Sequence, residues 1–159
     1  MTISEHTAKL LRDVYLGDNW TSSSLKQHVS DITYKEATTS YHFLNTIAKL
    51  VYHMDYYVIA AKGVLNGEPL TAKDKFSFDH PNFDSQAAWD NFLKGIFANA
   101  EELAILVEKL PEAKLLEDFS EGKYGSIYRN LHGIIEHLHY HLGQVVIIKK
   151  LIRSSDSKN

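Results

Sequence analysis

One stretch decides the fold that we predict for this chain: SIYRNLHGIIEHLHYHLGQVVIIKKLIR, residues 126–153. Apolar residues recur in it every three or four positions, which is the spacing of one face of an α-helix. These residues are Leu131, Ile134, Ile135, Leu138, Leu142, Val145, Ile148 and Ile152. Lys149, Lys150 and Arg153 suit the negative end of a helix dipole. We therefore expect a long amphipathic helix from Ser126 to about Arg153.

Three other stretches have the same periodicity and predict helices at residues 3–16, 33–66 and 84–110. Thr33 and Glu36 form a capping-box pattern at the start of the second predicted helix. The sequence is compatible with a bend in this helix near residues 38–40. Four amphipathic helices with one apolar stripe each predict an all-α fold, a four-helix bundle. We expect residues 1–159 to form one domain, with residues 154–159 as a frayed tail.

Two irregular connections complete this scheme, at residues 67–84 and 111–125. The first is long for a small domain, which is more typical of functional loops and allows a crossover connection in the bundle. Its Phe76 and Phe78 suit either a short strand or apolar side chains folded over the helices. We favour the second interpretation because the pattern of a strand is sparse.

The composition excludes several classes of protein. Among 159 residues there is no cysteine, so the chain has no disulfide, thiolate ligand or cysteine nucleophile. The net charge of -3 gives no reason to expect a nucleic-acid partner. The sequence has no run of about 18 apolar residues, so we expect no membrane span. The N-terminus lacks the features of a signal peptide. We expect a cytoplasmic protein.

Three of the nine histidines fall on apolar helix faces. His137 and His141 are four residues apart and share a face, since a helix advances about 100° per residue. His53 lies on the apolar side of the second predicted helix. His132 and His139 point away from this face. Each of the three is by itself more typical of a hydrogen-bonded core histidine than of a ligand.

Three imidazoles on two facing helices nevertheless suit one divalent ion, such as zinc or nickel. Three protein ligands leave coordination positions open, which is the pattern of a catalytic site. Gln144, Asn130 and Tyr57 lie close enough in helical register to orient a ligand or line a pocket. An ordinary packing role is the alternative for each of these three.

The stretch NLHGIIEHLHYHLGQ, residues 130–144, resembles the last-helix signature of the DinB-like family. That signature has a histidine, three residues, and then a second histidine within Tyr-His-x-Gly-Gln. NTIAKLVYH, residues 45–53, resembles the family's second-helix segment, and Trp89 fits the same pattern. The resemblance implies a four-helix bundle with a crossover, often homodimeric, and a divalent metal on His53, His137 and His141, commonly nickel or zinc. Some members of the family transfer or isomerise substrates with a low-molecular-weight thiol.

Three functions follow as hypotheses. In the first, a metal-dependent transferase uses a small thiol cosubstrate whose pKa the metal lowers, and acts on a small-molecule substrate. In the second, a metal-dependent hydrolase activates water, although no carboxylate is evident on the site face. In the third, the chain is a non-catalytic metal-binding or dimeric interaction protein, for which its aromatic residues supply interface surface.

Overall fold

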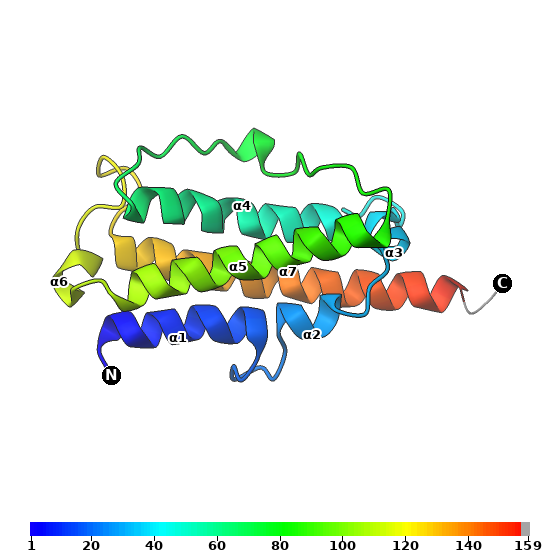
Figure 1. The fold of residues 1–159 in the computed structure, drawn as a ribbon, viewed down its shortest axis with the longest axis horizontal. Coiled ribbons are helices and arrows are strands. Elements are labelled where there is room, and N and C mark those ends of the chain that lie inside the picture. The colour runs from blue at the N-terminus through cyan, green and yellow to red at the C-terminus, as the bar shows by residue number, and fades with distance from the viewer. Residues whose placement is uncertain (157–159) are drawn as a thin grey trace.

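The structure is a computed structural model that describes residues 1–156, and within this range it contains helices and no strand (Figure 1). The all-α prediction is therefore confirmed. In chain order the elements are α1 (Ile3–Leu16), α2 (Leu25–Val29), α3 (Tyr34–Thr38), α4 (Ile47–Leu65), the 3-10 helix η1 (Asp74–Phe76), α5 (Gln86–Glu108), α6 (Glu112–Leu115) and α7 (Ile127–Asp156).

Side-chain caps determine where several helices begin. A serine or threonine precedes each of α1 to α5, and its hydroxyl accepts the backbone N–H three residues later, as at Thr46 and Ser85. This bond satisfies one of the N–H groups that the first helical turn leaves without a partner. The capping box predicted at Thr33 and Glu36 is formed.

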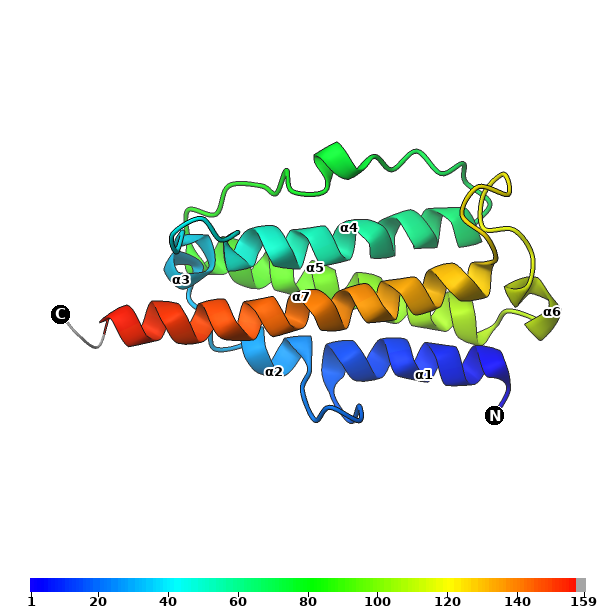
Figure 2. The ribbon, with the colours of Figure 1, turned by 180° about the vertical axis from the view of Figure 1, so that it is seen from behind.

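The four long helices lie side by side, and α1 and α4 each contact both α5 and α7 (Figures 1 and 2). α1 and α7 run in one direction, and α4 and α5 run in the other. α4 and α5 follow each other in the chain and are parallel, so residues 66–85 must return along their whole length. We call these residues the crossover segment; it passes outside α4 in both views.

The core between the helices is apolar, and ion pairs join the helices at its edges. Trp89 is fully buried and packs edge-on against Phe83, with ring centroids 5.3 Å apart. Arg12 of α1 forms ion pairs with Glu101 and Glu108 of α5. None of the helices in residues 1–156 is long and apolar enough to cross a membrane.

The predicted helix over residues 33–66 is wrong as a single element. The structure instead has α3 and α4, and residues 39–46 between them are not helical. The hydroxyls of Thr38 and Thr39 bond to backbone carbonyls of the preceding turn, and Thr39 is itself extended. Threonine side chains that compete for backbone groups in this way favour helix ends. His42 then adopts a left-handed conformation, which no helix accommodates.

The other differences are short helices and helix ends. α2 was not predicted, and α6 lies within the connection predicted at residues 111–125. Both are only one turn long, too short for a clear period to show in a sequence. α7 continues to Asp156, beyond the end predicted at Arg153, so residues 154–156 are helical. The remainder of the predicted frayed tail, residues 157–159, lies outside the described residues.

The crossover segment contains η1 and no strand, in agreement with the interpretation that we favoured. Its two phenylalanines differ in position. Phe76 is exposed, whereas the ring of Phe78 is stacked on the imidazole of His53 with centroids 4.1 Å apart. Ser77 between them is fully buried. The segment is thus attached to the helices at the point where His53 lies.

Asp55 of α4 is a buried acid on the side of the helix that faces α5. Only 5% of it is exposed, and its carboxylate accepts hydrogen bonds from the Asn99 side chain. Burial raises the pKa of Asp55 to about 7, while Asn99 and the charge of Lys62 act in the opposite direction. Near neutral pH the fold therefore carries the free-energy penalty of a buried charge.

An Asp55→Asn variant tests this penalty. The folded chain binds the Asp55 proton more tightly than the unfolded chain, so the wild type loses stability as pH rises from about 4 to about 7. Asparagine is neutral throughout and can still accept from Asn99. We expect the variant to be more stable than the wild type at pH 8 and close to it at pH 4, as measured by urea unfolding. The exposed Asp79→Asn variant is the control, and a difference between Asp55→Asn and wild type that does not change with pH would contradict the assignment.

Candidate metal centre

The structure brings His53, His137 and His141 together. His53 is on α4 and the other two are one turn apart on α7, which packs against α4. One ring nitrogen from each lies within 4.8 Å of those of the other two. His53 and His141 are buried and His137 is half-buried. His132 and His139 were predicted to point away from this face. His132 contacts the Tyr128 ring, and His139 contacts the Ile135 carbonyl.

The three rings meet edge to face, with centroids 4.4 Å apart for His137 and His141 and 4.8 Å apart for each of them and His53. The Nε2 atoms of His53 and His137 are 3.0 Å apart. Two nitrogens each about 2.0–2.1 Å from a zinc ion would be separated by a similar distance. The spacing of the ligand atoms of His53 and His137 thus fits one shared ion.

Hydrogen bonds at the opposite ring nitrogens leave Nε2 without a proton on two of the histidines. The Ser77 hydroxyl donates its hydrogen to the Asp74 carbonyl at 2.7 Å, so it accepts from Nδ1 of His53, which is 2.8 Å away. The Gln144 side-chain oxygen accepts from Nδ1 of His141 at 2.7 Å. A neutral imidazole that donates from Nδ1 has its lone pair on Nε2, the form in which histidine binds a metal.

Burial keeps the imidazoles of His53 and His137 neutral. Desolvation is the main cause that lowers the pKa of His53 below its ordinary value, and the electrostatic effect of the neighbouring His141 is the second. Desolvation also lowers the pKa of His137 to about 4, with contributions from His141 and His53. Metal binding requires unprotonated histidine. At neutral pH these two side chains are therefore already in the form that coordinates an ion.

The crossover segment supplies part of the surroundings of the histidines. The Tyr57 hydroxyl donates to the Asp74 carboxylate at 2.6 Å, and the Tyr57 ring meets the His137 ring edge-on at 5.1 Å. Burial, and then the bond to Asp74, raise the pKa of Tyr57 to about 12. Tyr57 therefore stays protonated at neutral pH and acts as a donor.

Of the three residues predicted to orient a ligand or line a pocket, two contact the histidines and one does not. Gln144 contacts His141 and Tyr57 contacts His53 and His137, as described. Asn130 touches none of the three histidines. Its amide donates to the carbonyls of Tyr124 and Ser126 at the start of α7. Asn130 thus holds the loop before α7, and near the site it lines a cavity wall.

No pattern in the sequence indicated that Asp74, Ser77 and Phe78 of the crossover segment contact His53 or Tyr57, although Phe78 was expected to fold over the helices. Only the unusual length of the segment indicated a role. Its irregular backbone has no period from which the direction of a side chain can be predicted.

Two adjoining cavities of about 310 Å³ each open beside the histidines and share Tyr57, Asn130 and Ile134 as walls. The arginine cavity is completed by Arg129, Gly133 and His137. The apolar cavity is completed by Ala60, Leu70, Ala72, Asp74, Phe119 and Tyr124. Each volume is at the lower end of the range of small-molecule sites, about 300–1,000 Å³. A small molecule in the arginine cavity would contact His137 directly.

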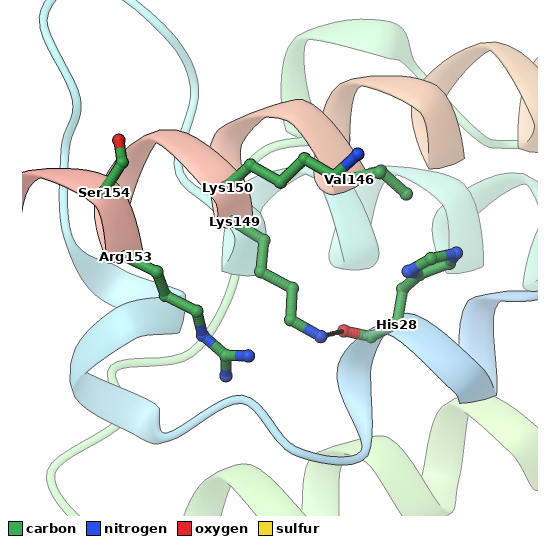
Figure 3. Close-up of a pocket in the computed structure, with 6 residues that line it drawn as sticks. All are labelled: His28, Val146, Lys149, Lys150, Arg153 and Ser154. Carbon is green, nitrogen blue, oxygen red and sulfur yellow. Dashed lines mark hydrogen bonds between the residues drawn. The ribbon is translucent and has the colours of Figure 1, made fainter.

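A further cavity of about 480 Å³ lies at the other end of α7 and contains none of the clustered histidines (Figure 3). Its lining is basic, with Lys149, Lys150 and Arg153 beside His28. Lys149 donates to the His28 carbonyl and forms an ion pair with Asp31, and Arg153 forms ion pairs with Asp31 and Glu36. Two of its cations already neutralise carboxylates of the fold, so we interpret this cavity as a structural contact.

Comparison with family models, curated proteins and solved structures gave no match to this chain. The assignment of a metal centre therefore rests on the three histidines and their contacts.

Metal content tests the site directly. We expect about one zinc or nickel ion per chain after reconstitution and dialysis at pH 7.5, and loss of that ion in a His137→Ala/His141→Ala variant, because a single imidazole does not retain it. Elemental analysis of protein without a histidine tag measures both. His132→Ala, on the same helix, is the matched control and should keep the ion. Equal metal content in all three proteins would exclude these ligands.

The hydrogen bonds at Nδ1 make a separate prediction. Ser77→Ala and Gln144→Leu each remove an acceptor that orients a ligand imidazole, and such changes typically weaken metal binding about 10–100-fold. Competition with a chromogenic chelator measures the affinity for zinc. Ser155→Ala, which removes a hydroxyl from the far end of α7, should bind zinc like the wild type. Wild-type affinity in both site variants would show that these contacts do not support the ligands.

Proposed function

We propose that this chain is a divalent-metal-dependent transferase that uses a low-molecular-weight thiol. The observation that carries the proposal is the convergence of three imidazoles, with an unprotonated Nε2 on two of them, beside cavities that admit a small molecule. Three protein ligands leave room for an exogenous ligand. Because the chain contains no cysteine, the reacting sulfur would come from a cosubstrate.

The proposal includes membership of the DinB-like family, with its four-helix bundle and a nickel or zinc ion. Supporting it are the spacing of His137 and His141 before Gly143 and Gln144, and the parallel α4 and α5 joined by the crossover segment. We further propose a homodimer in the cytoplasm. Phe43 and Ile147 are 96% and 58% exposed, line one shallow cavity beside Gln144, and offer apolar surface for a second copy.

His53, His137 and His141 would hold the ion, and Ser77 and Gln144 keep two of them in the coordinating tautomer. A bound divalent ion lowers the pKa of a thiol at the site and so favours the nucleophilic thiolate at neutral pH. Phe78 covers one face of the His53 ring and excludes water from it. Tyr57 remains protonated and donates its hydroxyl hydrogen to Asp74, so its oxygen can accept a hydrogen bond from a molecule in either cavity that it lines.

A metal-dependent hydrolase is the second candidate, and one observation favours it. Asp74 is a carboxylate near the histidines, where the sequence indicated none, and general-base activation of water requires such a group. Its carboxylate is engaged by the Tyr57 hydroxyl, which argues for a positioning role instead. Metal-dependent hydrolysis of esters or amides without any thiol would support the hydrolase.

Thiol transfer to a chromogenic aryl halide tests the proposal. An ordinary thiol of pKa about 8.5 is only about 3% ionised at pH 7, so full ionisation at the site can raise the rate about 30-fold. We expect zinc- or nickel-loaded protein to accelerate the reaction of cysteine or glutathione, and His137→Ala to return it to the background rate. His132→Ala should match the wild type. Identical rates for His137→Ala and wild type would refute thiol transfer at this site.

A further inference from the structure

Among residues 1–156, Arg129 differs from the other two arginines in having no carboxylate partner. Arg12 is paired with two glutamates, and Arg153 with Asp31 and Glu36. Within residues 1–156, the side chain of Arg129 has a single hydrogen bond, from Nη1 to the Tyr124 carbonyl at 3.3 Å. A guanidinium has five N–H donors, so most of those of Arg129 remain available for a ligand.

The position of Arg129 is nevertheless defined by the loop before α7. Gly125 has a φ of +75°, which favours glycine, and a Cβ built there would lie 3.1 Å from Cδ of Arg129. The aliphatic part of the arginine therefore packs over a residue without a side chain. Together with the bond to Tyr124, this contact holds the guanidinium in the wall of the arginine cavity.

The charges of the two cavities are separated. The lining of the arginine cavity contains Arg129 and no carboxylate. The apolar cavity has one carboxylate, Asp74, which already accepts the Tyr57 hydroxyl, and its other walls include Leu70 and Phe119. An anion is thus attracted to the end beside His137, and a neutral apolar group fits the other end.

We propose that the site takes a small carboxylic acid with an apolar chain or ring, whose carboxylate binds Arg129 and whose apolar part occupies the apolar cavity. This inference rests on the proposed function and specifies its substrate class. The planar guanidinium matches a carboxylate with two parallel hydrogen bonds. The bound acid would lie across Tyr57, Asn130 and Ile134, which line both cavities.

Binding of 3-phenylpropionate and of its neutral amide tests the inference by calorimetry. Metal-free protein is used first, so that the carboxylate cannot bind an ion, and zinc-loaded protein second. We expect the acid to bind about tenfold more tightly than the amide, the scale of a charge-assisted hydrogen bond. Arg129→Gln should reduce this preference to less than about twofold while the affinity for the amide is retained.

Gly133 provides a second, steric test. A Cβ built on Gly133 meets no atom within 4 Å, and Gly133 lines the arginine cavity, so we expect the side chain of Gly133→Leu to project into it. We expect it to weaken binding of the acid by about tenfold or more. Gly95→Leu is the matched control, because Gly95 is also helical and open but lies on α5, outside both cavities.

The outcomes separate this inference from the proposed function. Protein that binds zinc through its histidines but binds acid and amide equally, or does not bind the acid, overturns the inference alone. Retention of the preference in Arg129→Gln, or equal effects of Gly133→Leu and Gly95→Leu, also overturns it. Protein that binds no metal but shows a preference for the acid that depends on Arg129 overturns the proposed function and supports the carboxylate site.

Discussion

The packing of α4 against α7 is the contact on which the candidate site depends. It places His53 opposite two histidines that are one turn apart, so that three ring nitrogens come within 4.8 Å of one another. A rotation of either helix by one residue, about 100°, would turn its histidines to another face. The apolar residues on both sides of the histidines, such as Leu50 and Met54 on α4 and Leu138 and Val145 on α7, are buried and resist that rotation.

Segments outside the long helices make the cluster suitable for coordination. Buried polar groups need hydrogen-bond partners, and the partner of His53 is Ser77 of the crossover segment. That segment is long because α4 and α5 are parallel, and a return along their length exceeds the reach of a tight turn. The same topology therefore creates a cover for the site and brings Asp74 to Tyr57.

Several charged groups of the fold are satisfied by partners within the chain, such as Arg12 with its two glutamates and Lys149 with Asp31. Arg129 is an arginine without a carboxylate partner in residues 1–156, and it lines the cavity that contains His137. A cation without a carboxylate partner beside the three imidazoles gives one end of the site a positive potential, which selects for anions.

The sequence by itself determined the helical class and much of the local geometry. The positions of α1, α5 and α7 follow from apolar periodicity and capping residues, and His137 and His141 share a face because helix geometry is local. The break between α3 and α4 was not predicted, because the apolar periodicity continues through it. The hydroxyls of Thr38 and Thr39, which bond to carbonyls of the preceding turn, favour the end of a helix there. Only the tertiary structure decided that His53 faces the other two histidines, that Ser77 and Asp74 approach them, and that Arg129 lines the same cavity. These contacts join residues far apart in the chain, and they depend on the rotation of packed helices and on an irregular backbone, neither of which leaves a period in the sequence.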